Sequence, residues 1–566
     1  MPYAGGGAGV TLAALVLFAG VLMVLPLALL LGAGLMADGA PSLAPVRDAL
    51  DSRSVPRALW NSLESAAISA GLSLVAGTAI ALLVGLTDLR GKAALTFLVL
   101  IPMMIPPHVT AIAWTQAMGP SSPLLGTLGL APPPGSPHPL YGRGGVIALL
   151  AVQHMPLVFL VVLAALRTLP REMAEAARIS GARPRRLLFG VILPLLRPNL
   201  LAAYALAFVS SLGNFGIPAL LGIPGRYTTL PVLIWQRLSS FGPSMLADVA
   251  VLSALMALIA VAVVVIQMTL AARARAALIG PPQPPLHLAL GPARPLAEAG
   301  MVLLVLVTLG LPVTALFGTA LVVTYGLPLT PETLTLANFE EVLLRQSVTA
   351  RAFLNSTLAA GAAAALLALM AAVLARFLAG PRGPARRAGL GIATLAETTY
   401  AIPGIVISIA FILTFLRPLP ILGVSVYNTL WIIILAYLCA FFAVALKPAT
   451  AASLQLDPAL DEAAQVAGAG WGLRMRRIFL PLLAPAAASG AILVFLTAYN
   501  EITVSALLWS SGNETIGIVI YNLEHGGYTT IAAAMAAVTV VATVLLMGLL
   551  DRLGRRLPPG VVPWRL

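Results

Sequence analysis

Charged side chains are scarce in this sequence, and their scarcity excludes an ordinary soluble fold. Only 9% of the 566 residues are Asp, Glu, Lys or Arg, whereas 60% are hydrophobic. The mean hydropathy is +0.98. A soluble domain carries about 25% charged residues. Such a composition suits hydrocarbon better than water, so it predicts a protein embedded in a lipid bilayer.

Cysteine and clustered histidine are also lacking. Cys439 is the single cysteine, which excludes an internal disulfide and a cysteine metal cluster. We expect it to be a small buried apolar residue. The histidines are scattered, and none pairs with another at helical ligand spacing, so we expect no metal site. They are His108, His138, His154, His287 and His525.

A phosphate-binding loop of the form Gly-x-x-x-x-Gly-Lys-Ser/Thr is missing as well. The nearest string ends in Gly91-Lys92-Ala93, with the wrong spacing and without the hydroxyl group. Clustered catalytic groups are not found either. We therefore expect no enzyme activity and no cofactor in this chain, and any ATP that drives it must be bound by another protein.

Long hydrophobic runs are what the sequence has in abundance. A spanning helix needs about 20 mostly apolar residues, and twelve such runs predict an all-α membrane protein with about twelve transmembrane helices. The expected spans are 10–36, 58–86, 94–118, 145–167, 199–222, 246–271, 298–324, 353–378, 389–416, 427–447, 486–510 and 530–550. The first is too long for a signal peptide and lacks a basic start, so we interpret it as an uncleaved anchor.

The basic residues predict the orientation of these spans. If both termini are cytoplasmic, the inner loops and the tail hold 24 of the 33 Lys and Arg residues. This bias follows the rule that positive charge stays on the cytoplasmic side. The net charge of +13 then reflects topology and does not indicate nucleic-acid binding.

Two of the inner loops carry the same phrase. The first contains Glu175-Ala176-Ala177 and Gly181, and the second contains Glu462-Ala463-Ala464 and Gly468. Each residue of the second phrase lies 287 positions after its counterpart (175 to 462, 181 to 468). A constant offset near half the chain length indicates a tandem duplication. With six spans in each half, the two repeats are parallel.

The repeated phrase predicts a short helix in each loop. Alanines favour helix, acidic residues suit its first turns, and a glycine suits the left-handed position that ends it. In the second copy Asp457 can also cap the start. Such a helix outside the membrane is marginal alone and needs a partner surface.

The phrase resembles the signature loop of permeases in binding-protein-dependent ABC importers, in a form with both halves fused into one chain. Glu-Ala-Ala is followed after three residues by Gly and later by Leu-Pro, at Leu193-Pro194 and Leu480-Pro481. The second copy matches throughout, and the first departs only at Val191, where isoleucine is usual. The resemblance implies that each loop forms a coupling helix that docks on an ATP-binding subunit.

The resemblance also implies the organisation and the partners. We expect a first six-helix half at 1–279 with a coupling loop at about 168–196, and a second half at 297–566 with a coupling loop at about 448–485. Residues 280–296 would form a cytoplasmic linker. Expected partners are two copies of one ATP-binding subunit, which hold ATP and magnesium, an extracytoplasmic substrate-binding protein and membrane lipid. The expected location is a bacterial inner membrane.

Polar residues inside the spans are costly and are therefore candidates for the translocation path. We single out Asn214, Asn500 and Glu501, and at the 287-residue offset Asn214 aligns with Glu501. The alternative is that they only form hydrogen bonds between helices. Asn61-Ser62 and Asn355-Ser356 begin the second span of each half and are expected to cap or anchor those helices.

Two other readings stay open. A major-facilitator secondary transporter also has twelve spans, and 85–92 vaguely echoes one of its motifs, but that family does not predict paired Glu-Ala-Ala loops. The cargo is the second question. The string 213–224 resembles ferric-iron permeases, which favours iron(III), with thiamine and 2-aminoethylphosphonate importers as alternatives.

Overall fold

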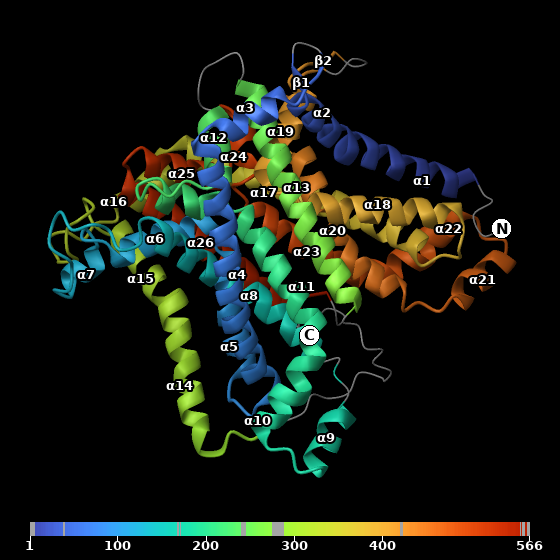
Figure 1. Ribbon diagram of the computed structural model, residues 1–566, viewed down its shortest axis with the longest axis horizontal. Coiled ribbons are helices and arrows are strands. Elements are labelled where there is room, and N and C mark those ends of the chain that lie inside the picture. The colour runs from blue at the N-terminus through green and yellow to red at the C-terminus, as the bar shows by residue number, and fades with distance from the viewer. Residues whose placement is uncertain are drawn as a thin grey trace.

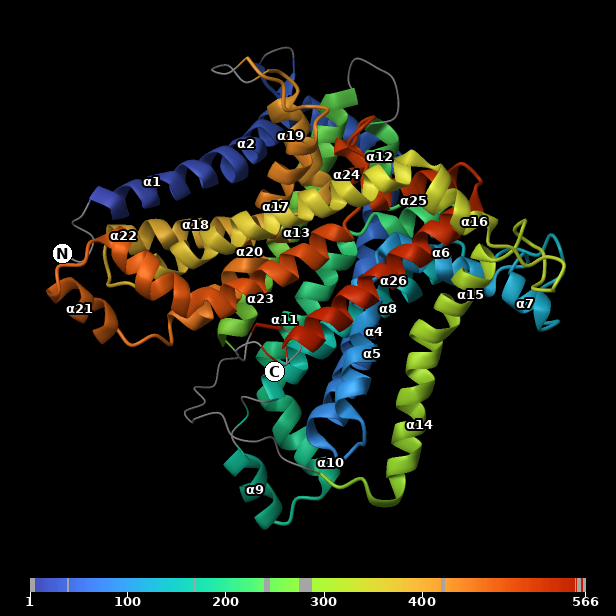
Figure 2. The same cartoon turned by 180° about the vertical axis from the view of Figure 1, so that it is seen from behind.

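The computed structural model describes residues 6–37, 40–166, 169, 171–238, 245–273, 288–418, 423–554, 556, 561 and 562. Within these residues the fold is helical, apart from one short hairpin of β1 (Met36–Ala37) and β2 (Ala40–Pro41). We call the described residues up to 273 the first half, and those from 288 the second half. Figures 1 and 2 show the molecule from opposite sides.

The helices of the first half run from α1 to α13. They are α1 (Gly6–Ala19), α2 (Leu25–Gly34), α3 (Ala44–Asp51), α4 (Ser54–Leu86), α5 (Lys92–Met104), α6 (Pro107–Met118), α7 (Pro123–Thr127), α8 (Arg143–Leu166), α9 (Arg171–Ile179), α10 (Pro184–Leu187), α11 (Leu193–Leu212), α12 (Leu230–Leu238) and α13 (Met245–Arg273). Short π-helical turns join α1 to α2 and α10 to α11, so each pair is one continuous rod.

The helices of the second half run from α14 to α26. They are α14 (Arg294–Val305), α15 (Leu311–Ala320), α16 (Ala337–Glu340), α17 (Ser347–Leu378), α18 (Pro384–Ala401), α19 (Gly404–Phe415), α20 (Leu430–Ser453), α21 (Ala459–Val466), α22 (Trp471–Arg474), α23 (Leu480–Tyr499), α24 (Ser505–Leu508), α25 (Ile516–His525) and α26 (Thr529–Gly554). Again π-helical turns join α14 to α15 and α22 to α23.

Ten of the described helices are long and apolar enough to cross a membrane, and two bent pairs raise the number to twelve. This confirms the predicted all-α membrane fold. The bent pairs occupy the expected spans 94–118 and 389–416, where the chain turns by 100° and 111°. We expected one span in each place, and the structure divides each of them into two helices at a sharp bend. Extended backbone at Ile105-Pro106 and Ile402-Pro403 interrupts the helical hydrogen bonds completely.

The fifth and eleventh spans also differ from their predicted limits of 199–222 and 486–510. The structure has them at Pro184–Leu212 and Trp471–Tyr499. Helix continues through the basic stretch that precedes each apolar run, so it resumes inside the ranges assigned to the coupling loops. It stops early at Gly213 and Asn500, which end the two rods.

Each half has a core of three long helices, α4 with α8 and α11, and α17 with α20 and α23. Small residues allow the close packing. On α4 a side chain added at Gly77 would lie 2.7 Å from the carbonyl oxygen of Met155 on α8. On α17 the buried positions include Ala359, Ala363 and Ala371. Contacts between small residues are how helices associate in lipid, where burial from water gives little driving force.

The first rod of each half packs on the other half. The rod α1–α2 lies along α18, α19 and α20, where Phe18 contacts Phe442 with ring centroids 5.6 Å apart. In return α15 packs on α6 and α7, and α14 lies beside α5. The halves are therefore interlocked and do not simply sit side by side.

The described end of the linker is fastened to the first half. The amide of Leu288 donates to the carbonyl of Leu86 at 2.6 Å, and the amide of Leu290 donates to the Asp88 carboxylate at 2.9 Å. The hydrogen bond from the Leu290 amide is the largest cause of the lowered pKa of Asp88. Arg294 also reaches Asp88, at 3.6 Å. The boundary at 279 and residues 280–287 of the predicted linker 280–296 lie outside the described residues, so the domain limits remain a prediction.

Candidate functional site: the coupling helices and the cavity between the halves

The repeated Glu-Ala-Ala phrases form the short helices α9 and α21. Both end in the same hydrogen-bonded cap. The amides of Gly181 and Ala182 donate to the carbonyls of Arg178 and Ala177, and the counterparts from Gly468 and Ala469 donate to Gln465 and Ala464, all at 2.9 Å. The two glycines have φ values of +80° and +75°, which side chains disfavour. At the start of α21, Asp457 accepts a hydrogen bond from the amide of Ala459 at 2.9 Å.

The two short helices lie at the ends of the two bundles. Figure 1 shows α9 at the foot of the molecule and α21 at its right-hand edge, away from α12 and α25 at the upper left. Glu462, Ala463 and Ala176 are exposed, and Glu175 and Ala464 are half-buried. The predicted coupling residues therefore occupy matching positions on two accessible helices.

One pair of residues on these helices was missed by the sequence reasoning. Ile179 is 88% exposed and Val466 is 90% exposed, higher than almost all other large apolar side chains that the structure describes. They are 287 positions apart and precede the capping glycines by two residues. A large apolar residue at the same offset on both helices, two positions before each capping glycine, was the available signal. Such side chains are suited to bury themselves in a partner protein.

Asn214 in the first half and Glu501 in the second half occupy the same kind of local structure. Each follows the end of its rod and accepts hydrogen bonds from the next helical turn. The side-chain oxygen of Asn214 accepts from the amide of Ile217 at 3.1 Å. The two carboxylate oxygens of Glu501 accept from Val504 at 2.5 Å and Ser505 at 3.1 Å. Both are thus capping groups for a helical turn.

A cavity of about 390 Å³ lies between the halves. The first half lines it with α11 and α13, and the second half lines it with α18, α19, α20 and the turn after α23. Glu501 is part of this lining, whereas Asn214 and Asn500 are not among the described residues that line it. Asn500 instead donates to the carbonyl of Leu496 at 3.2 Å.

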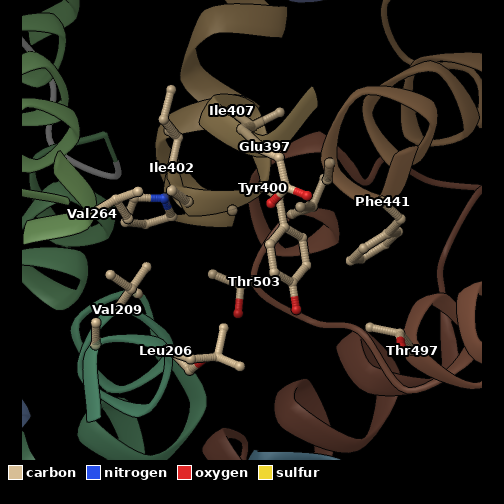
Figure 3. Close-up of a pocket in the computed structure, with 18 of the residues that line it drawn as sticks. Leu206, Val209, Val264, Glu397, Tyr400, Ile402, Ile407, Phe441, Thr497 and Thr503 are labelled. Carbon is tan, nitrogen blue, oxygen red and sulfur yellow. The ribbon is translucent and has the colours of Figure 1, made fainter. Parts of the chain in front are cut away.

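The charged groups of the cavity all come from the second half. They are Glu397, Lys447 and Glu501, and Lys447 pairs with Glu397 at 3.2 Å. In Figure 3 the hydroxyls of Tyr400 and Thr503 point into the same space. The lining therefore offers two carboxylates, one ammonium and several hydroxyls. Among the residues that the structure describes, no three His, Cys, Asp or Glu side chains form a metal-binding group.

An aromatic cluster joins the halves at α12 and α25. Tyr521 on α25 lies 5.7 Å from Phe215 and 6.1 Å from Trp235 of the first half, measured between ring centroids. His525 stacks on Tyr521 at 5.8 Å and meets Trp235 at 6.2 Å. Phe215, Trp235, Tyr521 and His525 are called the aromatic cluster below. They pack α12 and α25 against each other across the boundary between the halves.

The Asn-Ser pairs hold these short helices in place. Ser62 and Ser356 accept hydrogen bonds from the first amides of α12 and α25, Leu230 at 2.7 Å and Ile516 at 3.0 Å. We expected the pairs to cap or anchor the helices on which they lie; they do not cap them, and their side chains instead connect those helices to other segments. They lie inside α4 and α17, so their side chains are available to other segments. Asn61 and Asn355 donate to the loops before α12 and α25.

Ion pairs reinforce these two contacts, which we call the outer clasps because the predicted orientation puts them on the extracytoplasmic side. In the first half Arg143 pairs with Glu64 at 2.8 Å, and Tyr227 donates to Glu64 at 3.1 Å. In the second half Arg351 pairs with Glu514 at 3.0 Å. Burial alone would favour the neutral acid, but the hydrogen bonds from Arg351 and from the Gly512 amide hold the pKa of Glu514 below its usual value.

Comparison with known proteins agrees with this geometry. A family model described as "binding-protein-dependent transport system inner membrane component" matches residues 56–276 and 364–559. A probable ABC transporter permease of Sinorhizobium fredii is 26% identical over 88% of this chain and 86% of its own length. A ferric transport system permease of Actinobacillus pleuropneumoniae is 24% identical over 80% of this chain and 64% of its own length.

A third relative matches a shorter region. The putative 2-aminoethylphosphonate transport system permease of Salmonella choleraesuis is 30% identical over 36% of this chain and 71% of its own length. The two-part family match agrees with the 287-residue repeat, because it covers one Glu-Ala-Ala helix in each half, α9 or α21. The chain therefore belongs to the family of inner-membrane components of binding-protein-dependent transport systems, as a multi-pass ABC permease with both halves in one polypeptide.

Proposed function

We propose that this permease imports iron(III) by alternating access, driven by two copies of a separate ATP-binding subunit. The observation that carries the proposal is the pair of repeat-related helices, α9 and α21, at the ends of two bundles that share one cavity. ATP-driven approach of the two subunits would move both helices, and with them the bundles that enclose the cavity. The chain itself performs no covalent step.

The closed aromatic cluster supports a state of the cycle that is sealed on the outer side. Under the predicted orientation, α12 and α25 face the extracytoplasmic binding protein, and α9 and α21 face the cytoplasm. Phe215 and Tyr521 are fully or almost fully buried in the cluster. Cargo delivered from outside would therefore enter the cavity only after α12 and α25 separate. The proposal includes both termini in the cytoplasm and the protein in a bacterial inner membrane.

Two lines of support favour a cation as cargo. Ferric permeases match four-fifths of the chain, whereas the phosphonate permease matches about a third. The cavity has two carboxylates against one ammonium. An excess of negative groups attracts a cation and opposes an anion such as a phosphonate, and the low-dielectric surroundings strengthen both effects.

Reconstitution in proteoliposomes tests the proposal. The permease would be combined with the ATP-binding subunit and the binding protein that its own organism supplies, and uptake of labelled iron(III), thiamine and 2-aminoethylphosphonate would be compared. We expect ATP-dependent uptake of iron alone, and none with a subunit that binds ATP without hydrolysing it. A binding protein that ignores ferric iron but holds thiamine or a phosphonate would overturn the cargo. Uptake that is independent of ATP would overturn the importer.

A further inference from the structure

The coupling helix of the second half is held by a buried ionic network that contains Asp461, the residue before Glu462. Its side chain receives the guanidinium of Arg376 on α17 and that of Arg474 on α22, the second at 2.5 Å. All three residues are at most 7% exposed. Gln465 also donates to Asp461, at 3.0 Å. The guanidinium of Arg376 lies 4.4 Å from the ring centre of Phe479, which fixes it from the other side.

This network attaches α21 to the C-terminal end of α17, and the N-terminal part of α17 holds the outer clasp of the second half. Arg376 is in the last turns of α17, and Asn355 and Ser356 lie near its start. A helix rises about 1.5 Å per residue, so about 30 Å separate Ser356 from Arg376. Ser356 binds the first amide of α25, and α25 carries Tyr521 of the aromatic cluster. One continuous helix thus connects the coupling helix to the outer closure.

The first half has the outer clasp but not the residues for the inner attachment. Asp461 and Arg474 align at the 287-residue offset with Ala174 and Leu187. The Asn-Ser pairs align α4 with α17 at an offset of 294 (61 to 355), which places Leu82 opposite Arg376. None of these three residues can ionise, so these positions cannot form the same two ion pairs.

We propose that Arg376 and Asp461 make α17 a rod that carries the ATP-driven movement of α21 directly to α25 and opens the aromatic cluster. The two coupling helices are then mechanically unequal, because the aligned positions of the first half cannot make these ion pairs. Arg376 and Asp461 act as positioning residues, since neither is among the described residues that line the cavity. The inference rests on the proposed function.

Two matched variants distinguish the transmission of movement through α17 from a general contribution of the ionic network to folding. Arg376→Met removes the attachment to α17 and leaves Asp461 paired with Arg474. Arg474→Met removes the attachment to α22 and leaves Asp461 paired with Arg376. Each leaves one carboxylate with one guanidinium, so neither leaves the buried Asp461 unpaired, the change that most destabilises a protein. Folding and binding of the ATP-binding subunit are checked for both by co-purification.

The readout is the state of the aromatic cluster. Cys439 is the single cysteine and is buried, so Cys439→Ala followed by Trp235→Cys and Tyr521→Cys gives a clean pair across the halves. A short bifunctional thiol reagent measures how fast the pair cross-links, in the complex with ATP and a subunit that cannot hydrolyse it, and without nucleotide. We expect ATP to slow cross-linking at least tenfold in the parent and in Arg474→Met, and less than twofold in Arg376→Met.

The outcomes distinguish the two proposals. A tenfold effect of ATP that persists in Arg376→Met would overturn the rod. So would an equal loss of the effect in Arg376→Met and Arg474→Met, since the network would then only hold α21 in place. A parent complex that binds no ATP-binding subunit, or cross-links equally with and without ATP, would instead overturn the proposed function and the inference with it.

Discussion

At the scale of residues, the two copies of the repeat share a capping position after the rod, but the residue at that position is neutral in the first half and acidic in the second. Asn214 and Glu501 cap corresponding turns after corresponding rods, but only Glu501 lines the cavity and only Glu501 is acidic. A capping position accepts either residue type because it needs only a side-chain oxygen. One copy could therefore acquire a carboxylate for the cavity without losing its local structural role.

The charge of Glu501 is the first test at this scale. Glu501→Gln keeps a carbonyl oxygen for capping but removes one of the two carboxylates of the cavity. We expect iron uptake to fall about tenfold, an effect of about 1.4 kcal/mol, with assembly unchanged. Asn214→Ala in the same assay should cause a smaller loss. Unchanged uptake in both variants would contradict a place for these residues in the path.

The exposed apolar pair gives a second prediction. Changing Ile179 and Val466 to Asp puts a charge where each helix would bury an apolar side chain in the ATP-binding subunit. Loss of one such anchor costs about 2 kcal/mol, so we expect roughly 30-fold weaker binding for each single variant. Titrated co-purification measures this. Leu43→Asp, which changes an exposed apolar residue on another surface, is the matched control, and equal weakening by it would reject the docking role.

At the scale of elements, the outer clasps make a prediction about local stability. Ser356→Ala removes the acceptor for the first amide of α25, and loss of a capping hydroxyl costs about 1 kcal/mol. Hydrogen exchange at the start of α25 should therefore quicken about fivefold. Ser62→Ala should do the same at α12 and leave α25 unchanged. An identical exchange rate in the variant and the parent would show that the hydroxyl does not stabilise the helix.

The sequence predicted helices better than it predicted their breaks. Hydropathy located the ten candidate spanning helices and both bent pairs, because lipid demands about 20 apolar residues whatever the neighbours are. It could not give the bends at Ile105 and Ile402, because a proline shows where a helix can break, and packing decides how far it turns. In the same way the caps of α9 and α21 were predictable from local sequence, whereas the partners of Ser62 and Ser356 lie about 160 residues away.

At the scale of the whole molecule, the first rod of each half packs on the other half, and this packing should hold the halves together without a covalent connection. The rod α1–α2 packs on the second half and α14–α15 on the first. Two chains produced from a gene split between codons 279 and 280 should therefore co-purify and support uptake. Removal of residues 1–34 from the first chain is the control, and it should weaken the association strongly. Separation of the intact halves in mild detergent would contradict the interlocked arrangement.

The interlocked first rod also has a consequence for synthesis. Besides α13, the rod α1–α2 packs on α18, α19 and α20, and these three helices begin at Pro384, about 350 residues downstream of the rod. At about 5 to 20 residues per second, translation reaches them only tens of seconds after the rod leaves the ribosome. Until then lipid or an insertion factor must shield the faces of the rod that α18 and α20 later cover. The rod α1–α2 is thus among the first segments to be synthesised, but its packing against the second half is among the last contacts to form.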